Sequence, residues 1–107
     1  MEERLKQLLR LALKYNGNDI RIYKNHDEIF IDMRVDGILR KVKYKLGDEK
    51  LLGYMSYICG MDDDNSNAQT EVLETIVDGM NVKCRVARLN DLMVIRLIER
   101  EVLTNEI

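Results

Sequence analysis

The sequence predicts an α+β domain in which a mostly antiparallel sheet carries two helices. Two segments show apolar residues at helical spacing, and six show the alternation of polar and apolar residues that is typical of strands. The elements follow one another in the order αβββαβββ, and consecutive strands without a helix between them favour antiparallel meanders over a parallel sheet. The chain of 107 residues has the length of one domain and contains no proline, so we interpret residues 1–107 as a single domain.

The first half of the chain is predicted to form a helix followed by three strands. Apolar residues recur every three or four positions within residues 2–15, which places them on one face of a helix. The segment 16–18, Asn-Gly-Asn, tolerates a left-handed turn and should end this helix. Alternation then predicts three strands, with turns at 25–27 and 36–37 between them: residues 19–24, 28–35 and 38–44.

The second half is predicted to repeat this arrangement. Helical spacing returns in residues 48–61, where Asp48 is the expected N-cap. An acidic and polar segment follows at 62–67, and we interpret it as a linker. Three further strands are expected after it, with turns at 78–81 and 90–91 between them: residues 70–77, 82–89 and 92–99.

Composition and charge argue against several classes of function. The 17 Lys and Arg and the 19 Asp and Glu residues are spread along the chain and give a net charge of -2, so a nucleic-acid partner is not expected. No stretch approaches the roughly 20 apolar residues needed to cross a bilayer, and a signal peptide is not expected either. Cys59 and Cys84 lack the spacing of a metal site and are interpreted as reduced core thiols. We therefore expect a cytoplasmic protein without direct membrane insertion.

The chain lacks the sequence motifs of a complete active site. It contains no G-x-x-x-x-G-K-[ST], no G-x-G-x-x-G and no G-x-S-x-G. The one histidine, His26, lies in a predicted turn and is interpreted as a solvated turn residue. Counting from Asp63, polar residues stand where a calcium loop has its ligands, but Ala68 occupies the position that requires glycine. We therefore expect no catalysis by this chain alone and no metal site.

Three arginines lie within predicted strands: Arg34, Arg85 and Arg96. Arginine is the side chain best suited to bidentate contact with phosphate or carboxylate. Alternation along a half-exposed sheet also places charged residues on its solvent face without any functional demand. Their spacing therefore leaves two interpretations open, phosphate contact and simple exposure.

Four segments in order along the chain match a family pattern: N-D-I-R-I at 18–22, M-R-V-D-G-I-L at 33–39, V-K-C-R-V-A at 82–87 and V-I-R-L at 94–97. They resemble S-D-I-H-I-E, R-x-R-I-D-G-x-L, D-x-R-V-S and V-V-[IL]-R-[IL] of the secretion ATPase superfamily, in the domain just before the nucleotide-binding core. The resemblance runs from about Leu5 to Glu99. The chain is thus identified as a divergent member of the N-terminal domains of type II secretion and type IV pilus ATPases.

This resemblance implies a PAS-like fold and a non-catalytic role in a larger motor. In the family the chain continues into a RecA-like domain with the Walker motifs, and six copies form a ring. ATP and magnesium are then cofactors of the full-length protein, and this chain holds none itself. The implied partners are the RecA-like ATPase domain in cis or in trans, further copies in a homo-hexamer, and the inner-membrane platform protein of a secretion or pilus machine. The implied location is cytoplasmic and peripheral, at the inner face of the cytoplasmic membrane.

The resemblance also suggests a role for the three arginines. Arg85, supported by Arg34 or Arg96, would contact the nucleotide phosphates or the core. Such contacts would couple hydrolysis to the movement of this domain during protein secretion or pilus assembly. Under this interpretation the chain is an excised N-terminal domain or a truncated, stand-alone relative.

The chain departs from the family pattern at four places. Arg21 replaces the family's histidine, Tyr23 replaces the acid after it, and Lys83 replaces an aspartate. Of the family's P-Q-D-G-R segment only Gln69 remains, so the arginine of that segment is missing. The alternative function is therefore a stand-alone PAS-like interaction or ligand-binding module that needs no nucleotide.

Overall fold

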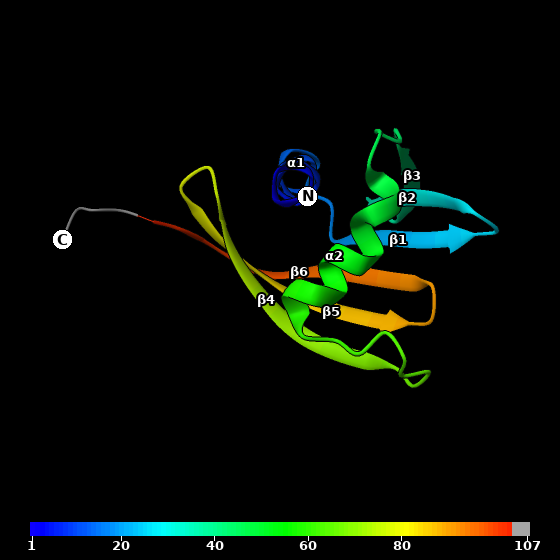
Figure 1. Ribbon diagram of the computed structural model, residues 1–107. Coiled ribbons are helices and arrows are strands. Elements are labelled where there is room, and N and C mark those ends of the chain that lie inside the picture. Colours follow the sequence, from blue (N-terminus) through cyan, green and yellow to red (C-terminus); the bar gives the residue numbers. More distant parts are fainter. Residues whose placement is uncertain (104–107) are drawn as a thin grey trace.

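The computed structural model describes residues 1–103 and shows an α+β fold with two α-helices and six antiparallel strands (Figure 1). The predicted α+β class is confirmed, and the α-helices and strands follow one another in the expected order, with one additional 3-10 helix before the second α-helix. Neither helix has the length and apolar composition needed to cross a membrane. The elements are α1 (Glu2–Tyr15), β1 (Asp19–Asn25), β2 (Glu28–Val35), β3 (Ile38–Val42), the 3-10 helix η1 (Asp48–Lys50), α2 (Leu51–Cys59), β4 (Gln69–Val77), β5 (Met80–Leu89) and β6 (Leu92–Val102).

The six strands form one sheet with the order β3-β2-β1-β6-β5-β4, and all neighbouring strands are antiparallel. Each half of the chain forms a three-stranded meander, and the pairing of β1 with β6 joins the two meanders. β1 and β6 are thus the central strands, and β3 and β4 are the edges. Two hairpins close through turns in which both residues have positive φ, the geometry for which Asp-Gly is favoured: Asp36-Gly37 and Asp78-Gly79.

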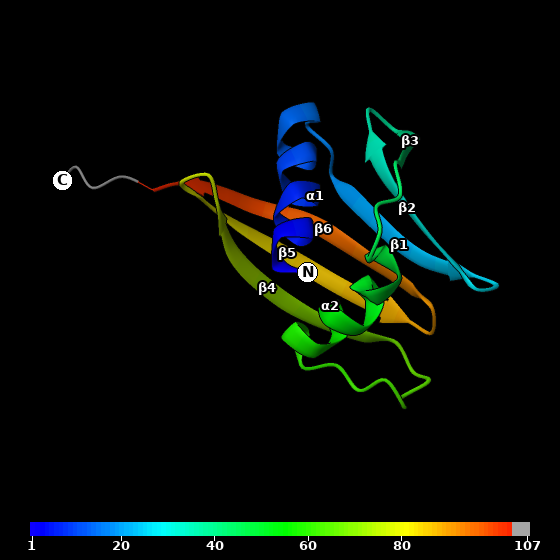
Figure 2. The same cartoon turned by 45° about the horizontal axis from the view of Figure 1, so that its top comes forward.

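Both helices lie on the same face of the sheet (Figures 1 and 2). The core forms between this face and the helices, from fully buried aliphatic side chains such as Leu8, Leu9, Ile20, Leu51 and Ile95. The opposite face, which neither helix covers, is called the open face below. It carries the alternate residues of each strand: Asp19, Arg21, Tyr23, Phe30, Asp32, Arg34, Leu39, Lys41, Val72, Arg85, Ala87, Leu92, Val94 and Arg96.

The predicted end of the first helix is confirmed. Asn16 adopts the left-handed conformation with a φ of 55°, and the Gly17 N–H donates to the carbonyl of Ala12 at 2.7 Å. A Cβ atom on Gly17 would lie 2.8 Å from the sulfur of Met33 in β2. Any larger residue at this position would therefore force the buried Met33 side chain to shift.

The predicted helix over 48–61 is shorter than expected, and Asp48 is not its N-cap. The regular helix α2 begins at Leu51, after the single turn of η1. The fully buried carboxylate of Asp48 instead accepts two hydrogen bonds from Arg4 of α1, at 2.8 and 2.9 Å, and one from the Lys45 N–H at 2.8 Å. The prediction was wrong because a guanidinium buried by α1 needs a carboxylate partner, and that partner is 44 residues away.

The strand boundaries differ from the predicted ones by a few residues. The third strand was expected to reach residue 44 but ends at Val42, where its pairing with β2 stops. The turn expected at 78–81 contains only two residues, because Met80 already pairs with Val77 across the hairpin. The sixth strand extends to Val102 instead of residue 99, since β5 pairs with it over that whole length.

The segment 62–67 connects α2 to β4, as expected of a linker, and polar contacts fasten it to the sheet. The Asp62 N–H donates to the side-chain oxygen of Gln69, and the Gln69 amide donates back to the Asp62 carbonyl, both at 2.8 Å. Arg88 of β5 forms an ion pair with Asp63. The segment is therefore held at its start and against the sheet.

Both cysteines are free thiols, as expected, and Cys84 is fully buried. Burial raises the pKa of Cys84 to about 12 and also raises the pKa of Cys59. Above about pH 9 the unfolded chain therefore releases the Cys84 proton, whereas the folded chain retains it until about pH 12. Because the unfolded state then binds fewer protons, the free energy of unfolding must fall as the pH rises through this range.

We expect Cys84 alone to lower the free energy of unfolding by about 1.4 kcal/mol per pH unit above about pH 9. The measurement is urea unfolding, followed by circular dichroism, at a series of pH values from neutral to alkaline. Tyrosine and lysine also titrate in this range, so the Cys84 contribution is the difference in slope between the parent chain and Cys84→Val, which keeps an apolar side chain in the core. Equal slopes for the two chains would contradict the prediction.

Candidate functional site

The three arginines singled out in the sequence lie in one row across the open face. Strand pairing places Arg34 opposite Asp19, Asp19 opposite Arg96, and Arg96 opposite Arg85. The row thus crosses the four strands β2, β1, β6 and β5, and Leu39 and Val72 continue it to the two edges. Residues that are 62 positions apart in sequence, Arg34 and Arg96, come to lie two strands apart. We call the four charged residues the arginine row.

Asp19 neutralises one of the three guanidinium groups. Its carboxylate accepts from Nε of Arg96 at 2.8 Å and from the second guanidinium nitrogen at 3.3 Å. This hydrogen-bonded pair raises the pKa of Arg96. The Arg34 guanidinium donates instead to the carbonyl of Gly37, at 3.2 Å. Asp19 is therefore committed to Arg96, although it also lies opposite Arg34.

Arg85 has no acidic partner among residues 1–103 and faces another arginine. Its side chain is exposed, and its cross-strand neighbour is Arg96. Like charges directly opposite each other on neighbouring strands disfavour the folded sheet. The row holds three positive charges and one negative charge, in a chain whose net charge is -2. A phosphate or carboxylate group placed between the Arg85 and Arg96 side chains would relieve this repulsion and accept bidentate hydrogen bonds.

The next two rows of the open face contain Arg21 and Tyr23, two residues at which the chain departs from the family pattern. Arg21 pairs with Asp32 of β2 through two hydrogen bonds of 2.8 and 2.9 Å, and this pairing raises the pKa of Arg21. Arg21 also lies over the ring of Tyr23, 5.2 Å from its centroid, and that ring stacks on Phe30 at 5.5 Å. These side chains are thus engaged with one another within the sheet. Cationic side chains of the open face that form no ion pair within residues 1–103 include Arg34 and Arg85 of the arginine row and Lys41 of β3.

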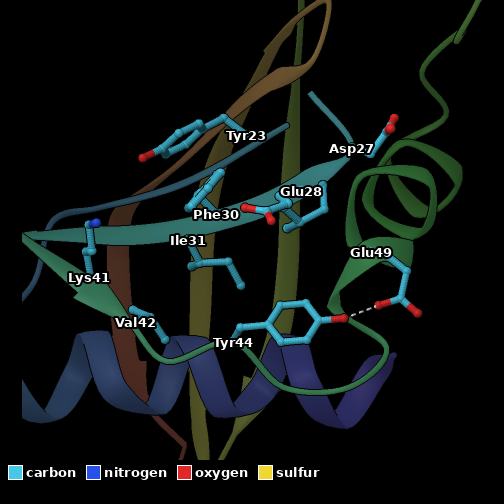
Figure 3. Close-up of a pocket in the computed structure, with 10 residues that line it drawn as sticks. Tyr23, Asp27, Glu28, Phe30, Ile31, Lys41, Val42, Tyr44 and Glu49 are labelled. Atoms are coloured by element: carbon cyan, nitrogen blue, oxygen red, sulfur yellow. Dashed lines mark hydrogen bonds between the residues drawn. The ribbon is translucent and has the colours of Figure 1, made fainter. Parts of the chain in front are cut away.

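A pocket of about 470 Å³ lies beside the edge of β2 (Figure 3). β3 ends at Val42, opposite Ile31, so residues 28–30 of β2 have no strand on that side. Beside this pocket, the hydroxyl of Tyr44 donates a hydrogen bond to the Glu49 carboxylate at 2.6 Å. This hydrogen bond lowers the pKa of Glu49 and raises the pKa of Tyr44. The lining is mixed, with aromatic, aliphatic and charged side chains: Tyr23, Asp27, Glu28, Ile29, Phe30, Ile31, Lys41, Val42, Tyr44 and Glu49. None of the three arginines lines this pocket.

Arg88 is a residue whose contacts the sequence interpretation missed. It belongs to the helix-bearing side of β5, where alternation predicts an apolar residue, and its side chain bonds Ser56 of α2 and Asp63 of the linker. Its Nε also donates to the carbonyl of Asn90 at 2.9 Å. The signal in the sequence was the charge itself, since an arginine at an inward position needs polar partners. Those partners come from elsewhere in the chain, and the periodicity of β5 does not identify them.

The other candidates from the sequence do not assemble into a site. His26 is exposed in the turn between β1 and β2, with a φ of 57°. Within residues 1–103, no group of three or more His, Cys, Asp or Glu side chains is placed to hold a metal ion. The arrangement that remains is a cationic row on an uncovered sheet, which can bind an anionic group.

Comparison with known proteins assigns no family to the chain. A scan against models of protein families found no match, and a search of curated proteins found none.

Proposed function

We propose that this chain is the non-catalytic N-terminal domain of a secretion or pilus-assembly ATPase, a PAS-like and divergent member of that family. The observation that supports this proposal is the arginine row on the open face. Three guanidinium groups with one carboxylate suit a phosphate-bearing partner, and the face that carries them is free to meet such a partner.

The sheet is suited to transmit movement because the row is carried by its inner strands. Arg34, Arg96 and Arg85 lie on β2, β6 and β5, none of which is an edge strand. Every one of these strands is hydrogen-bonded on both sides, so a force on the guanidinium groups acts on the sheet as one body. Coupling then requires that the row contact the partner differently in different nucleotide states.

The RecA-like domain would supply the Walker motifs, ATP and magnesium, and this chain would supply positive charge. Arg85 is the arginine of the row whose guanidinium forms no ion pair or hydrogen bond within residues 1–103, so it is the one proposed to reach the phosphates or the core. Arg96 and Arg34 flank it and keep the local potential positive. Assembly into a hexamer and contact with an inner-membrane platform protein belong to the same proposal.

The proposal predicts that the affinity of this domain for the core depends on the bound nucleotide. The experiment mixes residues 1–107 with the separately produced RecA-like domain expected to follow Ile107, and measures binding by calorimetry with ADP and with a non-hydrolysable ATP analogue. We expect the two dissociation constants to differ by about 5- to 150-fold, the usual range of coupling between two sites. Equal affinities in the two states, or no binding in either, would contradict the proposal.

The pocket beside β2 supports a second candidate function, a stand-alone PAS-like module that binds a small ligand or a peptide. Its volume of about 470 Å³ lies within the usual range for ligand pockets, and aromatic residues line it. The coding sequence downstream of Ile107 distinguishes the two candidate functions. A G-x-x-x-x-G-K-[ST] motif within about 50 residues after Ile107 favours the motor, and a stop codon directly after Ile107 favours the module.

A further inference from the structure

The two edges of the sheet carry charges of opposite sign. β3 contains Arg40 and Lys41 and no acidic residue, whereas β4 contains Glu71 and Glu74 and no basic residue. All four side chains are exposed, and none of them forms an ion pair with another part of residues 1–103. Each edge also exposes large apolar side chains: Ile38 and Leu39 on β3, and Val72 and Ile76 on β4.

The hairpin turns determine which backbone groups of β3 point away from the sheet. Val35 and Ile38 pair across a two-residue turn, so their N–H and C=O groups face each other. Backbone groups alternate along a strand, so Arg40 also directs its groups toward β2. Leu39 and Lys41 therefore present their N–H and C=O groups at the free edge.

The same reasoning applies to β4. Val77 and Met80 pair across the two-residue turn Asp78-Gly79, so Val77 directs its backbone groups toward β5. Counting back along the strand, Val72 and Thr70 direct theirs outward. At alternate positions, both edges thus offer backbone donors and acceptors that have no partner within the described residues 1–103.

We propose that a second copy of this chain docks its β4 on the β3 edge, so that the sheets of successive copies join head to tail. One antiparallel register brings the outward backbone groups of β3 opposite outward groups of β4, with Leu39 opposite Val72 and Lys41 opposite Thr70 of the second copy. In that register Arg40 lies opposite Glu71, and Ile38 lies opposite Leu73. The Arg40–Glu71 pair is complementary in charge, and the pairs Leu39–Val72 and Ile38–Leu73 are apolar, which are combinations that stabilise cross-strand contacts.

The direction of the strands is compatible with this joint. The sheet has six strands with antiparallel neighbours throughout, so β3 and β4 run in opposite directions. A β4 strand brought to the β3 edge by head-to-tail stacking is therefore antiparallel to it, and both copies turn their helices to the same side. Such a contact between two different surfaces continues from copy to copy and forms a ring or an open filament.

Pairing of like edges is disfavoured by the same charges. Two β3 edges would bring Arg40 and Lys41 against their counterparts, and two β4 edges would bring Glu71 and Glu74 together. Like charges opposite each other on neighbouring strands destabilise the pair. The charge distribution thus selects the joint between unlike edges.

The experiment is sedimentation velocity of the whole chain over a range of concentrations, for the parent and for two charge reversals, Arg40→Glu and Glu71→Arg. We expect the parent to associate with concentration, and each reversal to raise the dissociation constant by about tenfold or more. An equimolar mixture of the two variants should associate again, because each variant then offers the other a complementary edge. Arg100→Glu is the matched control, since it reverses an exposed arginine of the central strand β6 and should leave association unchanged.

Three results would overturn the proposal. One is a parent chain that stays monomeric at every concentration. Another is a mixture of the two variants that fails to associate although circular dichroism shows both to be folded. The third is an effect confined to one of the two reversals, which would indicate pairing between identical edges instead. High salt should weaken the association of the parent, because it screens exposed charges.

Discussion

Replacement of Asp48 by asparagine is expected to lower the free energy of unfolding by about 3–5 kcal/mol, the usual cost of removing one partner of a buried ion pair. Asparagine has nearly the same shape, so the loss comes from the charge. The Arg4 guanidinium, which is only 7% exposed, would remain buried without a carboxylate. The Lys45 N–H, which now donates to the Asp48 carboxylate, would have only a neutral and weaker amide acceptor. Urea unfolding followed by circular dichroism measures the change.

The matched control is Asp78→Asn, at the exposed ion pair between α1 and the β4–β5 turn. Asp78 accepts two hydrogen bonds from Arg10, so the geometry resembles that of the buried pair, but both side chains are largely exposed to water. Water and salt screen such a pair, and asparagine tolerates the left-handed conformation of this turn. The unfolding midpoint should therefore shift far less than for Asp48→Asn. Equal shifts for the two variants would show that burial is not the cause.

If the chain belongs to an ATPase, as we propose, replacement of Arg85 by alanine in that ATPase is expected to lower ATP turnover about 10³-fold, the lower end of the effect of an arginine that stabilises a transferring phosphate. The folded domain should not lose stability, because Arg85 has no acidic partner within residues 1–103 and faces Arg96. The change instead removes a like-charge contact. Turnover is measured by phosphate release, and stability by urea unfolding of residues 1–107.

Two further variants make this test specific to the row. Arg100→Ala removes an exposed arginine from β6 outside the row and should leave turnover unchanged. Arg85→Lys keeps the charge but removes the planar fork, so it should restore only part of the activity. Unchanged turnover in Arg85→Ala would remove the proposed role of this residue. A loss of turnover that accompanies unfolding would point to stability instead of phosphate contact.

Local patterns in the sequence predicted the elements because short-range physics determines them. Helical spacing in residues 2–15 predicts α1, and the Asn-Gly pair after it marks the left-handed end that the structure has at Asn16. Alternation predicts the six strands, and the Asp-Gly turns predict where two of the hairpins close. These features depend on backbone conformation within a few residues, so they can be inferred without knowledge of the rest of the chain.

The sequence by itself therefore determined the fold class, the element order and the residue types available to a site. Only the tertiary structure decided that β1 pairs with β6, which aligns Arg34, Asp19, Arg96 and Arg85 in one row. The same holds for the buried contact of Arg4 with Asp48, which periodicity could not distinguish from a helix cap. The β1–β6 pairing and the Arg4–Asp48 contact both join residues tens of positions apart. Such contacts form only when the whole chain buries its apolar surface and pairs its buried charges together.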